Sequence, residues 1–257
     1  MVFSTEFSPL LEEFDKNERL TMAAILKYFE NAGSRHSDAA GDSAIKVSET
    51  LGVAWVLTDW KVCVSEFPRY GQKIKVETWS EGLTSPFGTS RNYYLYADGA
   101  LAVEGTSKWV RFDLKAGRPM KVEADLLDRY GPEPGKKVFG GEKLAKISLP
   151  ETFASETKIQ LRRSDFDLNN HVHNLNYYDF ALEALPNGAV ASPESAASEN
   201  SSQAQEAAAA FKNARISYKT ALKEGDGAIA KYAPLDGKSV VAIYSGAGAL
   251  AAAIELY

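Results

Sequence analysis

The sequence of 257 residues is poor in cysteine and histidine and has no long apolar run. Its single cysteine, Cys63, excludes an internal disulfide and a cysteine-based metal cluster. No apolar run approaches the roughly 18 residues that a membrane-spanning helix needs. The formal net charge of −5 argues against broad nucleic-acid binding, which needs excess positive charge. An acidic protein partner is still compatible with this charge, because it would contact a local basic patch.

The amino-terminal residues also lack the features of a targeting segment. Met1 to Phe7 shows no basic start followed by an apolar stretch, and the acidic residues Glu12, Glu13 and Asp15 argue against a transit peptide. The 45% of hydrophobic residues is ordinary for a globular protein with a core. The sequence therefore predicts a mature, intracellular protein of the cytoplasm.

Hydrophobic periodicity in the first half predicts one helix followed by several strands. Apolar residues at helical spacing predict an amphipathic helix over 18–32 that ends at Gly33, after a short strand at 2–8. Runs of β-branched and aromatic residues predict strands at 51–66, 72–83, 88–97 and 100–113. Asp98-Gly99 is a strong hairpin signal between the last two. This order predicts an α+β domain in which an antiparallel sheet wraps around a helix.

The second half repeats this order after a connector over 115–150 that is rich in Gly, Pro and Lys. Its predicted elements are a strand at 157–162, a helix at 174–185 and strands at 211–223, 227–233, 238–245 and 249–257. Phe14-Asp15-Lys16-Asn17 aligns with Phe166-Asp167-Leu168-Asn169, so that Arg19 falls opposite His171. The echo and the common order of elements favour a tandem duplication. We therefore predict domains at 1–135 and 153–257, joined by a linker at 136–152.

One segment interrupts the second half. Residues 186–210 are rich in Ala and Ser and have almost no side chains to bury. They predict a mobile loop with a helical turn near Glu206–Phe211. A lid or a docking loop is the less favoured interpretation of this segment.

Two of the three histidines lie in one polar segment, Asp167 to Asn174. Histidine is well suited to move protons near neutral pH. If the segment is extended, Asp167, Asn169 and His171 point to the same side. The helix that follows from about Asn174 would direct its free N–H groups to the same place, which suits a polarised carbonyl oxygen. A helix cap is the competing interpretation, because Asp and Asn are common there, and the residues alone leave both open.

The segment Ser164 to Tyr177 resembles the signature of the acyl-ACP (acyl carrier protein) thioesterase family of plants and bacteria. In that family Asp-x-Asn-x-His-Val-Asn-Asn precedes an aromatic-containing helix. Further stretches that resemble the family are Leu20 to Leu26, Trp55-Val-Leu-Thr, Pro68-x-x-Gly71, Val76-Glu-Thr-Trp79 and Lys108-Trp109-Val110. The resemblance covers most of the chain. It implies two tandem hotdog domains, with acyl-chain binding in the first and the catalytic motif in the second.

The resemblance also implies an activity, namely hydrolysis of the thioester of fatty acyl-ACP to free fatty acid and ACP without a cofactor. Asp167 matches the family's catalytic aspartate and would act as nucleophile or as base toward water. Asn169 and His171 match the residues that would orient it and stabilise charge on the thioester oxygen. A non-catalytic acyl-binding module is the alternative function. A hotdog dehydratase or an acyl-CoA thioesterase fits the tandem layout less well.

The motif departs from the family pattern at two places. His173 stands where the family usually has Asn, and we interpret it as a tolerated change; with Asn174 it is an additional polar candidate. The family carries a glutamate shortly after a Tyr-(Arg/Lys) pair, whereas the matching position here is Ala221, which cannot transfer a proton. Glu224 could replace it only if the strand bulges or shifts its register.

Two further sets of residues are candidates for substrate contacts. Apolar and aromatic residues of the first half are candidates to line an acyl pocket, although they could equally be core: Met22, Tyr28, Trp55, Trp60 and Tyr93. Basic residues are candidates to contact the carrier protein, although a solvated edge is the plainer interpretation: Arg162, Arg163, Arg215, Lys219 and Lys223. Strand alternation predicts one common face for the last three. The Lys136-Lys137 region is a rival contact.

The remaining cysteine and histidine are expected to take no part in the chemistry. Cys63 alternates with apolar neighbours on a strand, which predicts a buried structural thiol. His36 follows Gly33 and is expected in a solvent-facing loop. No metal is expected, because nothing pairs His171 and His173 with further ligands at a usual spacing. A homodimer is left open as the assembly.

Overall fold

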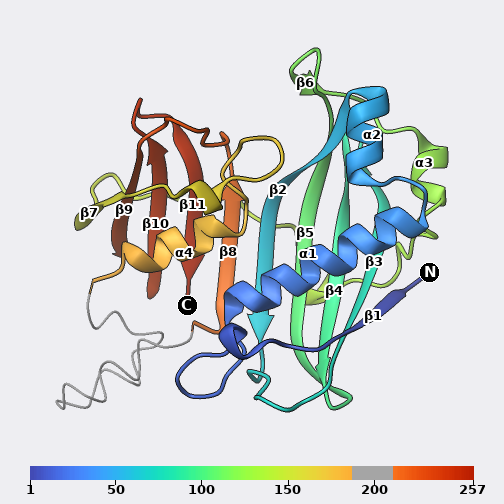
Figure 1. Cartoon of the computed structure of the whole chain (residues 1–257), viewed down its shortest axis with the longest axis horizontal. Helices are drawn as coiled ribbons and strands as arrows, with labels where there is room; N and C mark the ends of the chain where they lie inside the picture. Colours follow the sequence, from blue (N-terminus) through green and yellow to red (C-terminus); the bar gives the residue numbers. More distant parts are fainter. Residues whose placement is uncertain (187–210) are drawn as a thin grey trace. The chain divides into compact units, whose positions relative to one another are not determined.

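The computed structural model describes residues 1–186 and 211–257, which form two compact units, Met1–Lys143 and Leu144–Tyr257 (Figure 1). The first unit ends inside the segment that the sequence predicts as a linker. Most of the predicted loop over 186–210, including its helical turn near Glu206, lies outside the described residues.

The first unit is one antiparallel sheet with a long helix across it (Figure 1). Its strands are β1 (Phe3–Phe7), β2 (Val53–Val64), β3 (Ile74–Ser85), β4 (Gly88–Ala97), β5 (Ala100–Asp113) and β6 (Arg118–Pro119). The main strands lie in the order β1-β3-β4-β5-β2, and β6 pairs with β5. Its helical elements are η1 (Leu11–Glu13), α1 (Met22–Ala39), α2 (Ala44–Leu51), α3 (Ala124–Asp128) and η2 (Phe139–Gly141). The predicted Asp98-Gly99 turn is confirmed, since both residues have the positive φ of such a hairpin, 49° and 85°.

The core of this unit lies between α1 and the sheet. Phe29 of α1 stacks on Tyr93, with ring centroids 4.7 Å apart, and on Trp60 at 6.1 Å. All three side chains are fully buried. Gly105 makes room for them, because a Cβ atom there would lie 2.5 Å from the Phe29 ring. The absence of one side chain on β5 thus lets the helix sit close to the sheet.

The predicted end of the first helix at Gly33 is wrong, because α1 continues to Ala39. A Cβ atom at Gly33 would lie 3.3 Å from the Tyr93 hydroxyl and 3.4 Å from Arg91. The glycine therefore serves close packing against β4 and does not end the helix. α2, which the sequence analysis did not anticipate, ends at Gly52 in the left-handed conformation, with φ of 64°.

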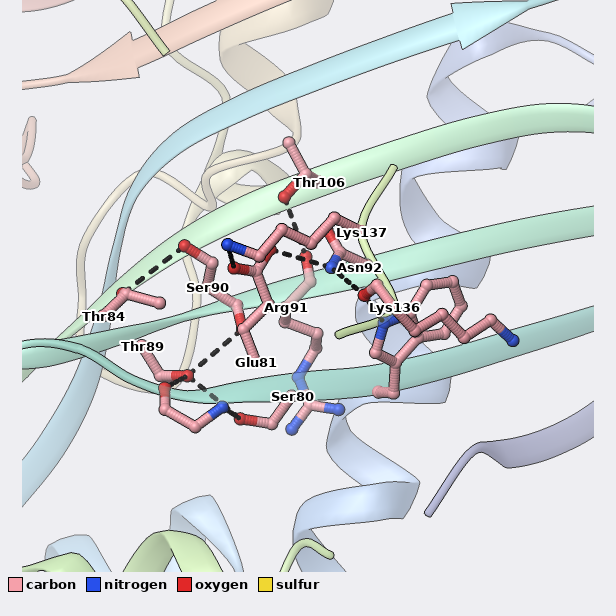
Figure 2. A network of polar contacts seen from close by, with 12 residues as sticks. Ser80, Glu81, Thr84, Thr89, Ser90, Arg91, Asn92, Thr106, Lys136 and Lys137 are labelled. Atoms are coloured by element: carbon pink, nitrogen blue, oxygen red, sulfur yellow. Dashed lines mark hydrogen bonds and ion pairs between the residues drawn. The ribbon is translucent and has the colours of Figure 1, made fainter. Parts of the chain in front are cut away.

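The connector after α3 is attached to β3 and β4 of the first unit by polar contacts (Figure 2). The indole N–H of Trp79 donates to the carbonyl of Lys136 at 2.6 Å, and the Lys136 ammonium lies 4.2 Å from the Trp79 ring centroid. The Lys137 ammonium lies 3.7 Å from the carboxylate of Glu81, which also accepts from Asn92 at 2.9 Å. Both lysines therefore have partners within their own unit, which weakens their candidacy as carrier contacts.

The second unit repeats the sheet-and-helix arrangement on a smaller scale (Figure 1). Its elements are β7 (Ser155–Ile159), η3 (Arg163–Asp165), α4 (Asn176–Glu183), β8 (Asn213–Tyr218), β9 (Ala228–Leu235), β10 (Lys238–Ser245) and β11 (Leu250–Leu256). The strands are antiparallel in the order β8-β11-β10-β9-β7. The predicted strand over 211–223 is too long, because β8 ends at Tyr218. Lys219 and Thr220 still donate to the Ala251 carbonyl of β11, and from Leu222 the chain pairs with the polar motif.

Candidate active site

A short hairpin turn precedes the main helix in each unit, and the two turns have the same backbone hydrogen bonds. The N–H of Asp15 donates to the carbonyl of Arg19, and that of Asp167 donates to the carbonyl of His171, both at 2.8 Å. The turn residues Glu18 and Asn170 both have positive φ, 59° and 55°. The sequence echo therefore corresponds to one local structure that occurs twice.

The Asp167 carboxylate closes its own turn. Its Oδ1 accepts the N–H groups of Asn169 at 2.7 Å and His171 at 3.1 Å. The segment is therefore a turn and not extended, so the condition for Asp167, Asn169 and His171 to point to one side by strand alternation is not met. An aspartate carboxylate can satisfy nearby backbone N–H groups, and this competes with the extended conformation.

The first repeat differs from the second at the other carboxylate oxygen. Asp15 Oδ1 accepts the N–H groups of Asn17 and Arg19, as in the second repeat. Its Oδ2 is held by the Arg19 guanidinium, at 3.0 Å from Nε and 2.9 Å from Nη2. The histidine at position 171 replaces this arginine. Within residues 1–186 and 211–257, Asp167 Oδ2 and the His171 imidazole have no hydrogen-bond partner, and both residues are partly exposed.

The other polar residues of the motif are arranged around this turn. The Asn169 side chain is exposed at the turn, beside Leu168, which is 87% exposed. His173 Nδ1 accepts the N–H of Leu175 at 3.4 Å, much as the Thr21 hydroxyl accepts the N–H of Ala24 in the first unit. His173 thus contributes to the start of the helix. α4 begins at Asn176, two residues later than predicted, and the Asn174 carbonyl accepts the Tyr218 hydroxyl at 2.9 Å.

The chain after β8 returns to the motif and pairs with it. The Val172 N–H donates to the Leu222 carbonyl at 2.8 Å, and Lys223 forms a β-bridge with His171. Ala221, the position of the family glutamate, is exposed. Glu224 follows the residue that faces His171, and it is exposed without a hydrogen bond or ion pair in the described part of the chain. Its proposed replacement of the glutamate stays a prediction.

The acyl-pocket candidates do not form one group. Met22, Tyr28, Trp60 and Tyr93 are buried in the first unit. Trp55 packs elsewhere, against the cluster of Val122, Leu127 and Tyr130, and its indole N–H donates to Asp42 at 2.7 Å. Tyr28 donates to the Glu13 carboxylate, and burial together with this carboxylate raises the pKa of Tyr28. These contacts place the residues in cores; an acyl-binding role for them stays a prediction.

The expected exposed edge of basic candidates is wrong for Arg215. Its side chain is 6% exposed, and its guanidinium donates to the Ala145 carbonyl at 2.9 Å. Arg162 holds the buried Asp165 at 2.7 Å, whereas Arg163 and Lys223 are exposed. Lys219 is also exposed.

Lys219 lies at a cavity of about 400 Å³ in the second unit. Its Nζ donates to the Ser217 hydroxyl at 2.8 Å. The cavity is lined by Lys146, Ile147, Ser148, Leu149, Ser217, Lys219, Leu250 and Ala253. Both charged side chains in this lining are cationic, so the cavity would favour an anion.

His36 and Cys63, which were predicted to have no chemical role, differ from prediction in their exposure. His36 is not in a solvent-facing loop but inside α1, 1% exposed, with its ring stacked on Phe3. Its Nδ1 lies 2.8 Å from Arg91 Nη1 and accepts from it, because a guanidinium can only donate. Burial and the charge of Arg91 lower the pKa of His36 to about 4. Cys63 is partly exposed, so the expectation of a buried thiol is wrong.

Two residues near the turn escaped the sequence analysis. Asp165, 1% exposed, accepts the N–H of Arg162, as Glu13 accepts that of Leu10 in the first unit. Tyr177 accepts the N–H of Leu222 at 3.0 Å. Asp165 corresponds to Glu13 in the repeat, and Tyr177 lies in the segment that resembles the family signature. Neither pattern predicts the hydrogen bonds that these two residues accept.

No three His, Cys, Asp or Glu side chains in the described ranges are arranged to hold a metal ion. Among the helices formed by those residues, none is long and apolar enough to cross a membrane.

Comparison with solved structures defines the fold. A 12:0-ACP thioesterase from Umbellularia californica aligns over 99% of this chain and 96% of its own, with a TM-score of 0.79 and 17% identity. An acyl-ACP thioesterase from Bacteroides thetaiotaomicron aligns over the same shares with a TM-score of 0.79 and 18% identity. These alignments confirm the predicted fold of two tandem hotdog domains.

Sequence comparison defines the family. The model of the acyl-ACP thioesterase N-terminal domain matches residues 1–130, and that of the C-terminal domain matches residues 150–197. The chain belongs to the acyl-ACP thioesterase family. Its curated relatives include oleoyl-acyl carrier protein thioesterase 1, chloroplastic, of Arabidopsis thaliana, 30% identical over 68% of this chain and 52% of the relative. A dodecanoyl-[acyl-carrier-protein] hydrolase, chloroplastic, of Cinnamomum camphora is 24% identical over 72% of this chain and 51% of the relative. The chain spans about half the length of these relatives.

Proposed function

We propose that this protein hydrolyses the thioester bond of fatty acyl-ACP at the turn from Asp167 to His171. The proposal is carried by the difference between the two repeats. In the first, the Arg19 guanidinium occupies the second oxygen of Asp15. In the second, the corresponding oxygen of Asp167 and the imidazole of His171 are both left for a substrate.

The geometry of the turn suits the chemistry of acyl transfer. Two backbone N–H groups hold Oδ1 of Asp167, which fixes the direction of the other oxygen. That oxygen attacks the thioester carbonyl or takes a proton from the attacking water. The C–S bond then breaks, water supplies the hydroxyl of the fatty acid, and a proton goes to the leaving thiolate.

His171 and Asn169 are proposed to stabilise the charge that develops on the thioester oxygen. Removing one such donor typically raises the barrier by about 2.7–4 kcal/mol. Glu224 is proposed for the role of the family glutamate, because it follows Lys223, which pairs with His171. His173 and Asn174 remain additional candidates, and the structure assigns His173 a contact at the helix start.

Substrate contacts outside the turn are also proposals. We propose the first unit, with Met22, Tyr28, Trp60 and Tyr93, as the site of the acyl chain. The exposed basic residues Arg163, Lys219 and Lys223 are proposed to contact the acidic carrier protein. A cytoplasmic location and a homodimer are proposed as well; the plant relatives named above are chloroplastic.

The direct test is the release of free thiol from a series of acyl-ACP substrates by the purified full chain. We expect release above background for at least one acyl length, and a higher kcat/KM with acyl-ACP than with the matching acyl-CoA. Saturable binding of acyl-ACP without release at any length would instead support a non-catalytic acyl-binding module.

A further inference from the structure

The backbone of Leu222 is held by hydrogen bonds on both sides. Its carbonyl accepts the Val172 N–H at 2.8 Å, and its N–H donates to the Tyr177 hydroxyl at 3.0 Å. Leu222 is 1% exposed and Tyr177 is 2% exposed, so water does not compete for these groups. One residue of the returning chain is thereby joined both to the motif and to α4.

The first repeat shows why a tyrosine is needed at this position. There Pro68 takes the place of Leu222, and its carbonyl accepts the Leu20 N–H at 2.7 Å. Proline has no N–H to satisfy. The sequence offset that relates Asp15 to Asp167 relates Ile25 to Tyr177, and Ile25 is fully buried. The second repeat therefore has both the buried Leu222 N–H and the Tyr177 hydroxyl that accepts it. The first repeat has neither, because Pro68 and Ile25 take their places.

The held segment leads directly into the candidate active site. Lys223, the next residue, forms the β-bridge with His171, and Glu224 follows it. The other end of the segment is fixed at Tyr218, whose hydroxyl donates to the Asn174 carbonyl and whose ring lies edge-on to Tyr177 at 5.6 Å. The N–H groups of Lys219 and Thr220 still donate to the Ala251 carbonyl of β11. From Leu222 on, the bonds to Tyr177 and Val172 replace the ladder of β8.

We propose that Tyr177 is a positioning residue for the hydrolytic site: its hydroxyl fixes the segment 219–224 against the turn from Asp167 to His171. Through this segment it sets the position of the His171 backbone and of Glu224. The inference rests on the proposed function of the same turn, but the hydrogen bond can be tested separately. Burial raises the pKa of the Tyr177 phenol, which therefore stays protonated in the neutral range, near the carboxylates of Asp226 and Asp167.

The substitution Tyr177→Phe removes only the hydroxyl. Tyr178→Phe is a matched control on the same helix, because Tyr178 is 5% exposed and its hydroxyl has no hydrogen bond in the described part of the chain. Two readouts are needed: amide hydrogen exchange of residues 219–224, and kcat and KM with acyl-ACP. For Tyr177→Phe we expect exchange in this segment to rise and kcat to fall, each by about tenfold, with KM changed less than about threefold. Tyr178→Phe should change neither readout.

The two readouts separate the possible failures. Unchanged exchange in Tyr177→Phe would overturn the role of the hydroxyl in fixing the segment. Faster exchange with wild-type kcat would overturn its role in the reaction. An inactive wild type would refute the proposed function, while the exchange experiment would still decide whether the hydroxyl holds the segment.

Discussion

Arg19 and His171 occupy the same place in two hairpin turns that are otherwise built alike. Burial raises the pKa of Asp15, but the hydrogen bonds from the Arg19 backbone and guanidinium outweigh this and lower it. Both oxygens of the Asp15 carboxylate are therefore engaged within the protein. The His171 ring makes no such bond in the described residues, and Asp167 keeps one oxygen available. At this scale, one side chain distinguishes a structural turn from a candidate catalytic one.

A prediction at the same scale concerns His36, a buried histidine far from the turn in sequence. Its pKa is about 4 in the folded protein and 6.5 as the reference value, because of burial and the neighbouring Arg91. Between these pH values the unfolded state binds more protons than the folded state. The free energy of unfolding should therefore fall as the pH falls from 6.5 to 4, by up to about 1.4 kcal/mol per pH unit from this group.

Urea unfolding at several pH values, with His36→Asn as the comparison, measures this contribution. The asparagine oxygen can still accept from Arg91 but does not titrate, so its pH slope should be shallower than that of the wild type. The ring stands among Phe3, Tyr130 and Arg91, with the amino-terminal amine nearby as a further positive charge. Parallel slopes for both proteins would assign the pH dependence to other groups.

The elements show what periodicity could and could not predict. β4, β5 and β10 have their predicted bounds, because alternation and turn residues mark them locally. α1 runs past Gly33 because that glycine packs against β4, a contact between residues distant in sequence. β8 stops at Tyr218 because the chain leaves β11 after Thr220, and Leu222 bonds to Tyr177 of α4 and to Val172 of the motif. The resemblance located the candidate site. Its turn was not predicted, because the residues alone are compatible with a catalytic segment and with a helix cap.

The packing of α1 on the sheet gives a prediction at this scale. Gly105→Ala would place a methyl group 2.5 Å from the Phe29 ring, in a core where Phe29 is fully buried. We expect the free energy of unfolding to drop by about 1–3 kcal/mol, as for other overpacked cores. Gly135→Ala is the control, because its Cβ atom would meet nothing within 4 Å. Thermal and urea unfolding check this; equal stability of the two variants would mean that the helix does not depend on Gly105.

The whole molecule carries a net charge of −5, although its proposed partner is an acidic protein. Recognition must then depend on a local basic surface and not on the overall field. Lys219 and Lys223 are exposed, and Lys223 pairs with His171 of the turn, whereas Arg215 is buried and cannot contribute. The two units share their turn and the order of their sheet and helix, yet only the second combines an open carboxylate with this basic surface.

The double substitution Lys219→Glu with Lys223→Glu tests this surface. We expect KM for acyl-ACP to rise by about fivefold or more, equivalent to about 1 kcal/mol, with kcat little changed. Lys46→Glu with Lys115→Glu makes the same change in net charge on exposed residues of the first unit and should leave KM unaltered. A similar rise in KM for both double variants would point to net charge and against a local contact.

The most direct test of the central claim compares Asp167→Asn with Asp15→Asn in the acyl-ACP thiol-release assay. In each variant the carboxamide oxygen can still accept the two backbone N–H groups of its turn, so both proteins should fold. For Asp167→Asn we predict a loss of kcat of at least about a hundredfold. Asp15→Asn should keep wild-type kcat and lose only stability, because its ion pair with Arg19 is removed. Wild-type kcat in Asp167→Asn, or equal losses in both variants, would contradict the assignment of hydrolysis to the second turn.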